Sequence, residues 1–204
     1  MHDLLLRLPD IAAVRDRCRA LAMLDAVLSP DWEGRYYSFD AQWGEGEEMA
    51  SMRDGCGDDW FMVFSSAGVY ARGFAHESQN APHLLTEVPE VFRSIVEEPA
   101  FAGHDGSPIV TVCFWRQTGD AHWRAPVAAA TGGAELFGLL ADGTAGAYRE
   151  WAEEYYEPEH EPSLSAVEHV LALRPLTAEV VSALNPDTDL DELADDIAGI
   201  GYPV

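Results

Sequence analysis

Lysine is absent from this chain of 204 residues, and all 12 of its basic residues are arginine. Against them stand 36 acidic residues, which give a formal net charge of -24 at pH 7. So large an excess of negative charge repels a phosphate backbone, and we expect no nucleic-acid partner. The acidity has two interpretations. It maintains solubility in a bacterium that uses arginine for lysine or is adapted to salt, or it steers a basic partner onto the protein.

Cysteine is scarce, and its spacing argues against two kinds of stabilisation. Cys18, Cys56 and Cys113 are an odd number, lie far apart and form no CxxC pair. A disulfide framework and a structural zinc site are therefore not expected. Cys18 and Cys113 fall in apolar patterns and are predicted to be core residues. Cys56, between two glycines, is predicted to be exposed.

Long apolar runs are also missing. No stretch approaches the roughly 20 apolar residues that span a bilayer, and the opening MHDLLLRLPD has no basic region or small-residue cleavage site. We therefore expect a cytoplasmic protein without a membrane partner. Because 48% of the residues are hydrophobic and no linker is visible, residues 1–204 are expected to form one globular domain.

Four apolar or alternating stretches predict an antiparallel meander. The run Trp60–Phe64 indicates a strand buried on both faces, and a turn at 65–68 leads into Val69–Ala75, which completes a central hairpin. Two strands precede it, at 35–43 and 48–53; the first alternates, with Tyr37, Phe39, Ala41 and Trp43 on one face. Further patterns predict a turn at Asp105-Gly106, a strand at 109–115 and a weaker strand at 122–127. Residues 136–140 fit a strand or a helix, and the flanking glycines favour a last strand.

Along the chain, helices are expected before, within and after the strands of this sheet. Asp10 is a candidate N-cap for a helix that ends at Ser29-Pro30, and a short helix lies between Pro89 and Pro99. Further helices begin near Thr144, Ser163, Thr177 and Leu190. The predicted fold is α+β: one antiparallel sheet of about five to seven strands within 29–143, with the N-terminal helix and the helical segment 144–204 packed on it.

The helical segment carries a large part of the negative charge. Residues 149–204 contain 14 acids and two arginines, a net charge of -12. If the helices are amphipathic, their outer faces form an acidic surface that attracts a basic partner while aromatic rings supply contact area. The binding residues expected there are Glu150, Glu153, Glu154, Tyr156 and Glu157. The helical spacing turns Trp151 and Tyr155 inward and leaves Tyr156 as the exposed ring; the competing interpretation is a solvated helix face.

A second cluster combines arginines, carboxylates and aromatic rings at the predicted strand ends, in residues 32–37 and 53–59. Arg35 or Arg53 would bind an anionic group of a ligand while Tyr36 stacks on it. The structural alternative is a turn ion pair between Arg53 and Asp54, with the aromatic rings in the core.

The loop after the central hairpin contains the only catalytic pattern that we consider. His76 next to Glu77 could serve as a general base, with Ser78 as a nucleophile, but no G-x-S-x-G elbow is present. The alternative is a buried histidine that ties the loop to the sheet. The histidines and glutamates at 153–169 lack a metal-binding order, so we expect no metal site and no cofactor.

Several stretches together resemble a family of bacterial proteins with no assigned activity. The resemblance runs from about Leu21 to Pro203 and rests on DWEGRYYSFDAQW, MASMRDGCGDDWFMVF, GFAHES, VPEVFRSIVEEPAF, YREWAEEYYE and ALNPDTDLDELADDIAGIGYP. It implies no catalytic residues. In the order of its elements alone, the chain is similar to immunity proteins of the SUKH type, which neutralise bacterial toxins.

The leading hypothesis is a non-catalytic acidic binding protein of a bacterial cytosol that occupies a basic protein, with an immunity or antitoxin-like protein as one form. The alternative is a small-molecule-binding or hydrolytic enzyme with a pocket around Arg35, Arg53, His76 and Glu77. A third is a structural homo-oligomer. The sequence leaves the oligomeric state open.

Overall fold

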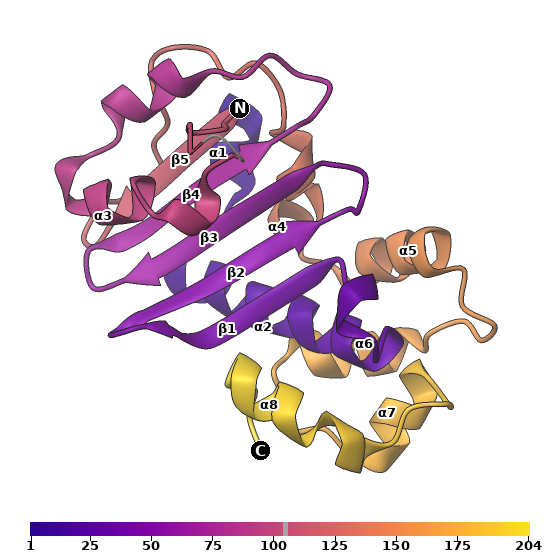
Figure 1. Cartoon of the computed structure of the whole chain (residues 1–204). Coiled ribbons are helices and arrows are strands. Elements are labelled where there is room, and N and C mark those ends of the chain that lie inside the picture. Colours follow the sequence, from indigo (N-terminus) through magenta and orange to yellow (C-terminus); the bar gives the residue numbers. More distant parts are fainter. Residues whose placement is uncertain (104–105) are drawn as a thin grey trace.

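The computed structural model describes residues 1–103 and 106–204, and it confirms the α+β fold. The described residues form a five-stranded antiparallel sheet in the order β1-β2-β3-β4-β5 (Figure 1). Consecutive strands are neighbours throughout, so the predicted meander of the first four strands is confirmed. The strands are β1 Tyr37–Gly44, β2 Glu47–Arg53, β3 Asp59–Ser65, β4 Gly68–Phe74 and β5 Val112–Gln117.

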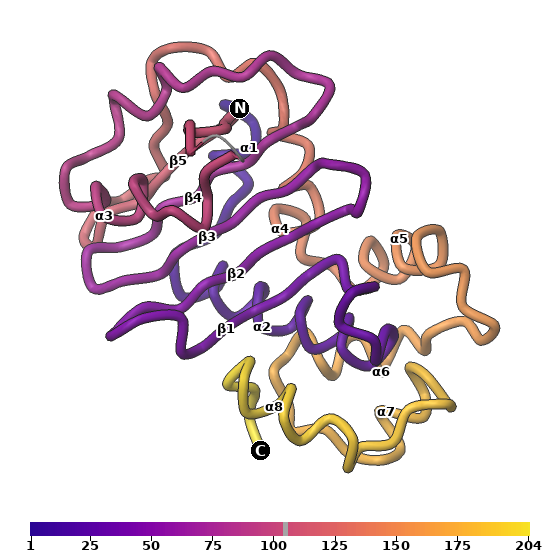
Figure 2. Tube along the Cα trace, viewed as in Figure 1, coloured from indigo at the N-terminus to yellow at the C-terminus, as the bar shows by residue number. Residues whose placement is uncertain are grey.

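Helices precede, interrupt and follow the sheet, as the chain trace shows (Figure 2). The α-helices are α1 His2–Arg7, α2 Ile11–Leu28, α3 Arg93–Val96, α4 Gly138–Asp142, α5 Ala145–Tyr156, α6 Leu164–Leu171, α7 Ala178–Leu184 and α8 Ala194–Ile200. Short 3-10 helices are η1 Trp32–Gly34, η2 Pro82–Glu87, η3 Glu90–Phe92, η4 Pro99–Phe101, η5 Glu135–Phe137 and η6 Leu190–Leu193.

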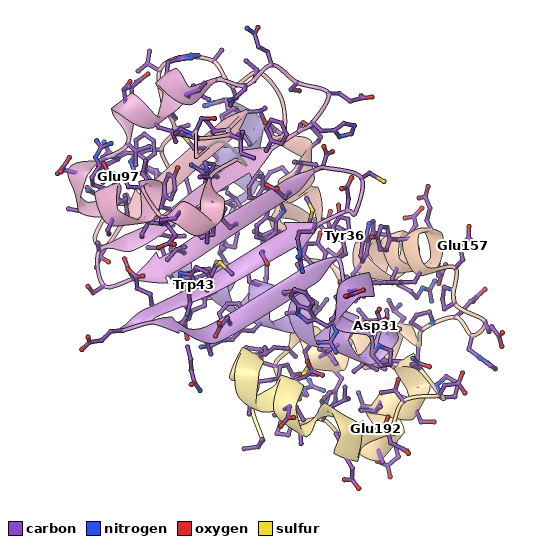
Figure 3. All side chains as sticks on the ribbon, in the orientation of Figure 1. Asp31, Tyr36, Trp43, Glu97, Glu157 and Glu192 are labelled. Carbon is purple, nitrogen blue, oxygen red and sulfur yellow. The ribbon has the colours of Figure 1, made fainter. Side chains whose placement is uncertain are left out.

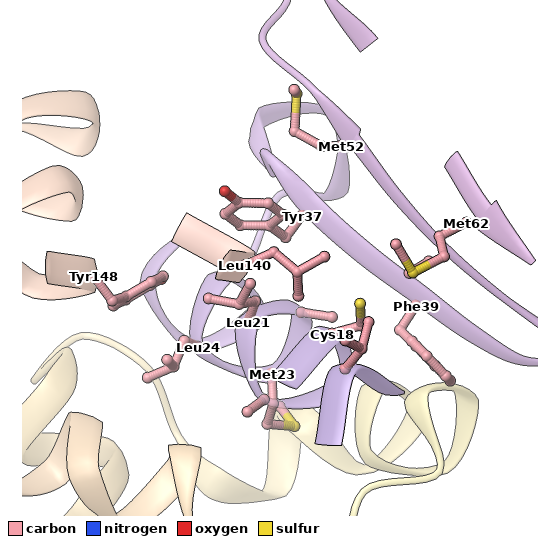
Figure 4. Close-up of a cluster of buried hydrophobic side chains, with 14 of the residues drawn as sticks. Cys18, Leu21, Met23, Leu24, Tyr37, Phe39, Met52, Met62, Leu140 and Tyr148 are labelled. Atoms are coloured by element: carbon pink, nitrogen blue, oxygen red, sulfur yellow. The ribbon is translucent and has the colours of Figure 1, made fainter. Parts of the chain in front are cut away.

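The first face of the sheet is covered by α2 and the C-terminal helices. The Asp10 carboxylate accepts a hydrogen bond from the Ala13 N–H at 2.9 Å, so the predicted N-cap is confirmed. From the helix, Cys18 and Leu21 pack into a core that also contains Tyr37 and Met62 from the sheet (Figure 4). This burial removes apolar surface from water, which is the main driving force for folding.

The second face is covered over only part of its width. Alternate strand residues point to it, and Phe61, Val63 and Tyr70 pack there beneath Leu84 and Phe92 of the connection between β4 and β5. The described parts of this connection, residues 75–103 and 106–111, lie over the β3–β5 side of the sheet in Figure 1, and the same face of β1 and β2 is less covered. The uneven cover positions the cavity described below.

Two strand predictions were wrong. Residues 136–140 are helical, because Phe137 and Leu140 are buried three positions apart and the Leu136 carbonyl accepts a hydrogen bond from the Trp60 indole at 3.0 Å. Residues 122–127 form only an isolated bridge between Arg124 and Trp115. Pro126 has no N–H to extend that pairing. The turn predicted at Asp105-Gly106 begins outside the described residues.

The predicted states of the three cysteines are confirmed: Cys18 and Cys113 are buried and Cys56 is exposed, each as a free thiol. Within the described ranges, no helix has both the length and the apolar character that crossing a bilayer requires.

Candidate functional site

The acidic helical surface, which we define as the carboxylates of residues 149–204, lies almost wholly in solvent. Its exposed members are Glu150, Glu154, Glu157, Glu159, Glu161, Glu168, Glu179, Asp187, Asp189, Asp191, Glu192 and Asp195. Figure 3 labels Glu157 and Glu192 at the outer edge of the C-terminal helices. The other two carboxylates, Glu153 and Asp196, are half-buried and form ion pairs with Arg149 and Arg35.

The prediction for Tyr156 was wrong, because this ring is half-buried and Tyr155 is the exposed one. The Tyr156 hydroxyl donates to Asp25 Oδ2 at 2.8 Å and accepts from the Tyr36 N–H at 3.2 Å. Tyr155 is 38% exposed and stacks on Trp151 with the ring centroids 5.2 Å apart. The end of α5 therefore faces the buried Asp25, which helical spacing alone does not reveal.

Asp25 is the acceptor at the centre of this packing. It is fully buried, and its carboxylate accepts hydrogen bonds from the Tyr148 hydroxyl at 2.7 Å and the Tyr37 N–H at 2.7 Å, besides those of Tyr156 and Tyr36. Burial raises the pKa of Asp25 to about 6, although these hydrogen bonds act in the opposite direction. The cluster joins α2, the start of β1 and α5, and its role is structural.

Arg35 holds the C-terminal helix onto the sheet. Its guanidinium is buried, and its Nη2 donates to Asp196 Oδ2 of α8 at 3.0 Å while Nη1 pairs with the other carboxylate oxygen. Nε donates to the Ser29 carbonyl at 2.9 Å. Tyr36 is half-buried, and the centroid of its ring lies 4.8 Å from that of the Trp151 ring. Neither side chain is therefore placed to bind an external ligand without a rearrangement.

His76 and Glu77 lie on the surface. His76 Nδ1 is 2.6 Å from Asp58 Oδ1, and the His76 N–H donates to the same oxygen at 2.8 Å. The hydrogen bond to Asp58 raises the pKa of His76; despite partial burial, the same contact lowers the pKa of Asp58. Glu77 is exposed. This histidine does tie the loop to the sheet, but from the surface, not from a buried position.

Arg53 borders a cavity of about 320 Å³ with aromatic walls. Its guanidinium lies 4.4 Å from the centre of the Trp32 ring, and it forms no ion pair with Asp54 among the described residues. Asp54 Oδ1 instead accepts from the N–H groups of Cys56, Gly57 and Asp58 at 2.8–2.9 Å. Arg35, Arg53, His76 and Glu77 thus have separate surroundings and do not converge.

The cavity, here called the aromatic cleft, lies on the second face of the sheet and has a volume of about 320 Å³. Five aromatic residues line it: Trp32, Trp43, Trp60, Phe61 and Phe101. Three charged side chains join them: Arg53, Asp59 and Arg72. The clustering of aromatic walls with a few charged groups is typical of small-molecule sites.

Two of the charged groups of the aromatic cleft, Arg72 and Asp59, are shielded from water, whereas Arg53 is exposed. Arg72 is only 2% exposed, its Nη2 donates to the Phe101 carbonyl, and its guanidinium lies 4.9 Å from the centre of the Phe61 ring. Burial raises the pKa of Asp59 to about 6, opposed by the positive charge of Arg72.

Sequence reasoning placed Trp32, Arg53 and Asp59 in one cluster but missed Trp43, Arg72 and Phe101. The alternating pattern assigned Trp43 to the face of Tyr37 and Phe39. A register shift in β1 between Asp40 and Gly44 interrupts that alternation, and Trp43 stacks on Phe101 with centroids 5.8 Å apart on the opposite face. Figure 3 labels Trp43 on this face. Arg72 in an otherwise apolar strand was the available signal.

No family model matches the chain, and no curated protein or solved structure matches it either. Within residues 1–103 and 106–204, no group of three or more histidine, cysteine or acidic side chains has a geometry that could hold a metal ion.

Proposed function

We propose that this protein is a non-catalytic binding protein of a bacterial cytosol, and that its acidic helical surface occupies a basic partner protein. An immunity or antitoxin-like protein, which blocks a cationic site on a toxin, is the form that we favour. The observation that carries the proposal is the exposure of 12 carboxylates in residues 149–204, where only two arginines are present.

Electrostatics favours this surface over the rest of the chain. Residues 1–28 contain four arginines and four aspartates, so they are neutral, whereas residues 149–204 have a net charge of -12. Of the two arginines in the acidic segment, Arg149 is already paired with Glu153 at 3.2 Å. The uneven distribution gives a field that attracts and orients a cationic partner, and salt screens it over about 8 Å at physiological ionic strength.

Apolar contact area lies next to the carboxylates. Tyr155 is exposed and rests on Trp151, and Glu150 and Glu154 are exposed on the same helix, α5. An aromatic ring held by stacking loses little conformational freedom when a partner covers it. The end of α5 is therefore the part of the surface that we assign to the centre of the interface.

A matched pair of variants tests the proposal. The first carries Glu150→Gln, Glu154→Gln and Glu157→Gln; the control carries Glu33→Gln, Glu45→Gln and Glu77→Gln, which remove the same charge from exposed positions elsewhere. Each is immobilised and exposed to lysate of the native host at low and at high salt. We expect a cationic partner that wild type and control retain at low salt, that high salt releases, and that the first variant loses.

Two results would contradict the proposal. Recovery of no partner at either salt concentration removes the binding function. Equal loss of binding in both triple variants shows that total charge, and not the surface at α5, attracts the partner.

The geometry around Arg35, Arg53, His76 and Glu77 does not favour the alternative of an enzyme with a pocket formed by these four residues. Arg35 is bound to Asp196 and His76 to Asp58, and no shared cavity brings the four side chains together within the described part of the chain.

A further inference from the structure

The aromatic cleft contains two arginines without an ion-pair partner. Neither Arg53 nor Arg72 forms a salt bridge within 4.0 Å to a carboxylate of the described residues. The chain has three acidic residues for each arginine, 36 against 12, so a partner carboxylate is rarely far away. Two unpaired arginines at one cavity make this the place in the fold best suited to an anionic group from outside.

Arg72 supplies a second, independent observation. It is 2% exposed, and its Nη1 is buried without a well-formed hydrogen bond to any described residue. The side chain nearest to this guanidinium as a hydrogen-bond partner is the Tyr70 hydroxyl, which is itself buried and carries no charge. Arg72 is thus held by two neutral acceptors, the Tyr70 hydroxyl and the Phe101 carbonyl, and its buried positive charge has no carboxylate partner within 4.0 Å among the described residues.

The walls of the aromatic cleft select for a flat, apolar group. Phe101 stacks on Phe61 with the ring planes inclined by 12°, and on Trp43 with the planes inclined by 17°. Trp32 is 54% exposed at the rim, where Arg53 lies over its ring. A volume of about 320 Å³ accommodates a ligand of one or two rings.

The connection between β4 and β5 already places an aromatic ring and an oxygen acceptor in the aromatic cleft. Phe101 inserts an aromatic ring between Phe61 and Trp43, and its carbonyl oxygen accepts a hydrogen bond from Arg72 Nη2. An aromatic ring joined to an oxygen acceptor is thus the chemical pattern that this cleft holds. A carboxylate is a stronger acceptor for arginine than a carbonyl, and it can bind in a bidentate manner.

We propose that the aromatic cleft binds a small aromatic carboxylate, with the carboxylate at Arg72 and Arg53 and the ring against Trp43, Phe101 and Trp32. This site is distinct from the acidic helical surface. The Asp59 carboxylate at the same cavity accepts a hydrogen bond from an amino or hydroxyl substituent on the ring.

Calorimetric titration of the purified full chain tests the site with benzoate and indole-3-carboxylate at concentrations up to millimolar. Benzamide keeps the ring without the charge, cyclohexanecarboxylate keeps the charge without the aromatic ring, and adenosine monophosphate carries a phosphate in place of the carboxylate. We expect binding of at least one aromatic carboxylate that is about tenfold or more tighter than binding of its two matched analogues.

Variants locate the site. Arg53→Gln should weaken binding about tenfold, and Arg174→Gln, which removes the same charge from an exposed position outside the cleft, should leave it unchanged. Trp43→Ala should weaken binding in the same way through the lost ring contact. Arg72→Gln alters a buried residue, so its circular dichroism and unfolding midpoint are compared with wild type before titration. If Arg72→Gln does not fold, the binding measured for Arg53→Gln decides the test.

Three outcomes overturn the proposal. Binding of no aromatic carboxylate by the folded wild type removes the site. Equal weakening by Arg53→Gln and Arg174→Gln shows general charge attraction. Adenosine monophosphate binding more tightly than every carboxylate overturns the ligand class and points to phosphate. None of these results bears on the acidic helical surface, so the two proposals fail independently.

Discussion

Asp25 and Tyr148 are 123 positions apart in the chain, yet both are buried and their side chains are joined by a hydrogen bond of 2.7 Å. This bond connects α2 to α5. The Tyr156 hydroxyl and the N–H groups of Tyr36 and Tyr37, at the start of β1, complete the set around the same carboxylate. We expect Asp25→Ala to lower the free energy of unfolding by about 3 kcal/mol or more, because four donors lose their acceptor.

Asp25→Asn is the matched control for that change. The Asn oxygen can accept from the N–H groups of Tyr36 and Tyr37 and from the Tyr156 hydroxyl. Its amide donates to the Tyr148 hydroxyl, which then acts as an acceptor in place of a donor. We expect a loss of about 1 kcal/mol, measured by urea unfolding. Equal losses for Ala and Asn would show that the hydrogen bonds do not determine the stability at this position.

The stability of the protein should depend on the protonation of Asp25. Burial raises its pKa in the folded state from 3.8 to about 6, so the folded protein holds this proton more tightly than the unfolded chain. The resulting stabilisation is complete below about pH 3.8 and is lost as pH rises through 6. Between pH 4.5 and 7.5 this group alone should lower the free energy of unfolding by about 2 kcal/mol.

Urea unfolding of wild type and Asp25→Asn at those two pH values isolates this contribution from that of the other carboxylates. The wild type should lose about 2 kcal/mol more than the variant on going from the lower to the higher pH. Parallel pH dependence in the two proteins would show that Asp25 does not titrate in this range.

The ion pair between Arg35 and Asp196 is expected to anchor α8. Asp196→Ala removes the only carboxylate bound to Arg35 among the described residues and leaves a guanidinium that is 8% exposed. We expect a loss of about 2 kcal/mol, with faster amide hydrogen exchange confined to α8. Asp195→Ala, which changes an exposed neighbour, is the control and should have little effect. Unchanged exchange in α8 would contradict the anchoring role.

Two turn glycines should respond differently to alanine. A Cβ at Gly68, whose φ is +131°, would lie 2.2 Å from the Arg116 carbonyl oxygen of the neighbouring strand. A Cβ at Gly46, whose φ is +74°, would meet nothing within 4 Å. We expect Gly68→Ala to cost several kcal/mol and Gly46→Ala about 1 kcal/mol, measured by thermal unfolding. Similar losses would show that the sheet relaxes around the added methyl group.

Asp59 should make ligand binding in the aromatic cleft depend on pH. Its pKa is raised to about 6 by burial, with Arg72 and Arg53 opposing and Asp58 and Asp54 reinforcing the shift. Above that pH its negative charge competes for the arginines, so unsubstituted benzoate should bind more tightly at pH 5.5 than at pH 7.5. Asp59→Asn should remove most of this difference in a calorimetric titration. An unaltered difference would exclude Asp59 as its source.

Much of the local structure follows from the sequence because it depends on neighbouring residues. The caps Asp10 and Thr177 accept hydrogen bonds from N–H groups three positions later, as their residue types predict. The central hairpin is set by two apolar runs around a turn. Residues 136–140 show the limit, because a short apolar run fits a strand or a helix equally well until Trp60 binds the Leu136 carbonyl.

The sequence by itself therefore determined the α+β class, the meander, most helix starts and the concentration of acidic residues after position 149. Only the tertiary structure decided which groups meet. A register shift places Trp43 on the second face, and the Tyr156 hydroxyl donates a hydrogen bond to Asp25. The carbonyl of Phe101, from another part of the chain, accepts a hydrogen bond from Arg72. Such encounters depend on the packing of segments far apart in sequence, and no local pattern of backbone hydrogen bonds or side-chain spacing encodes them.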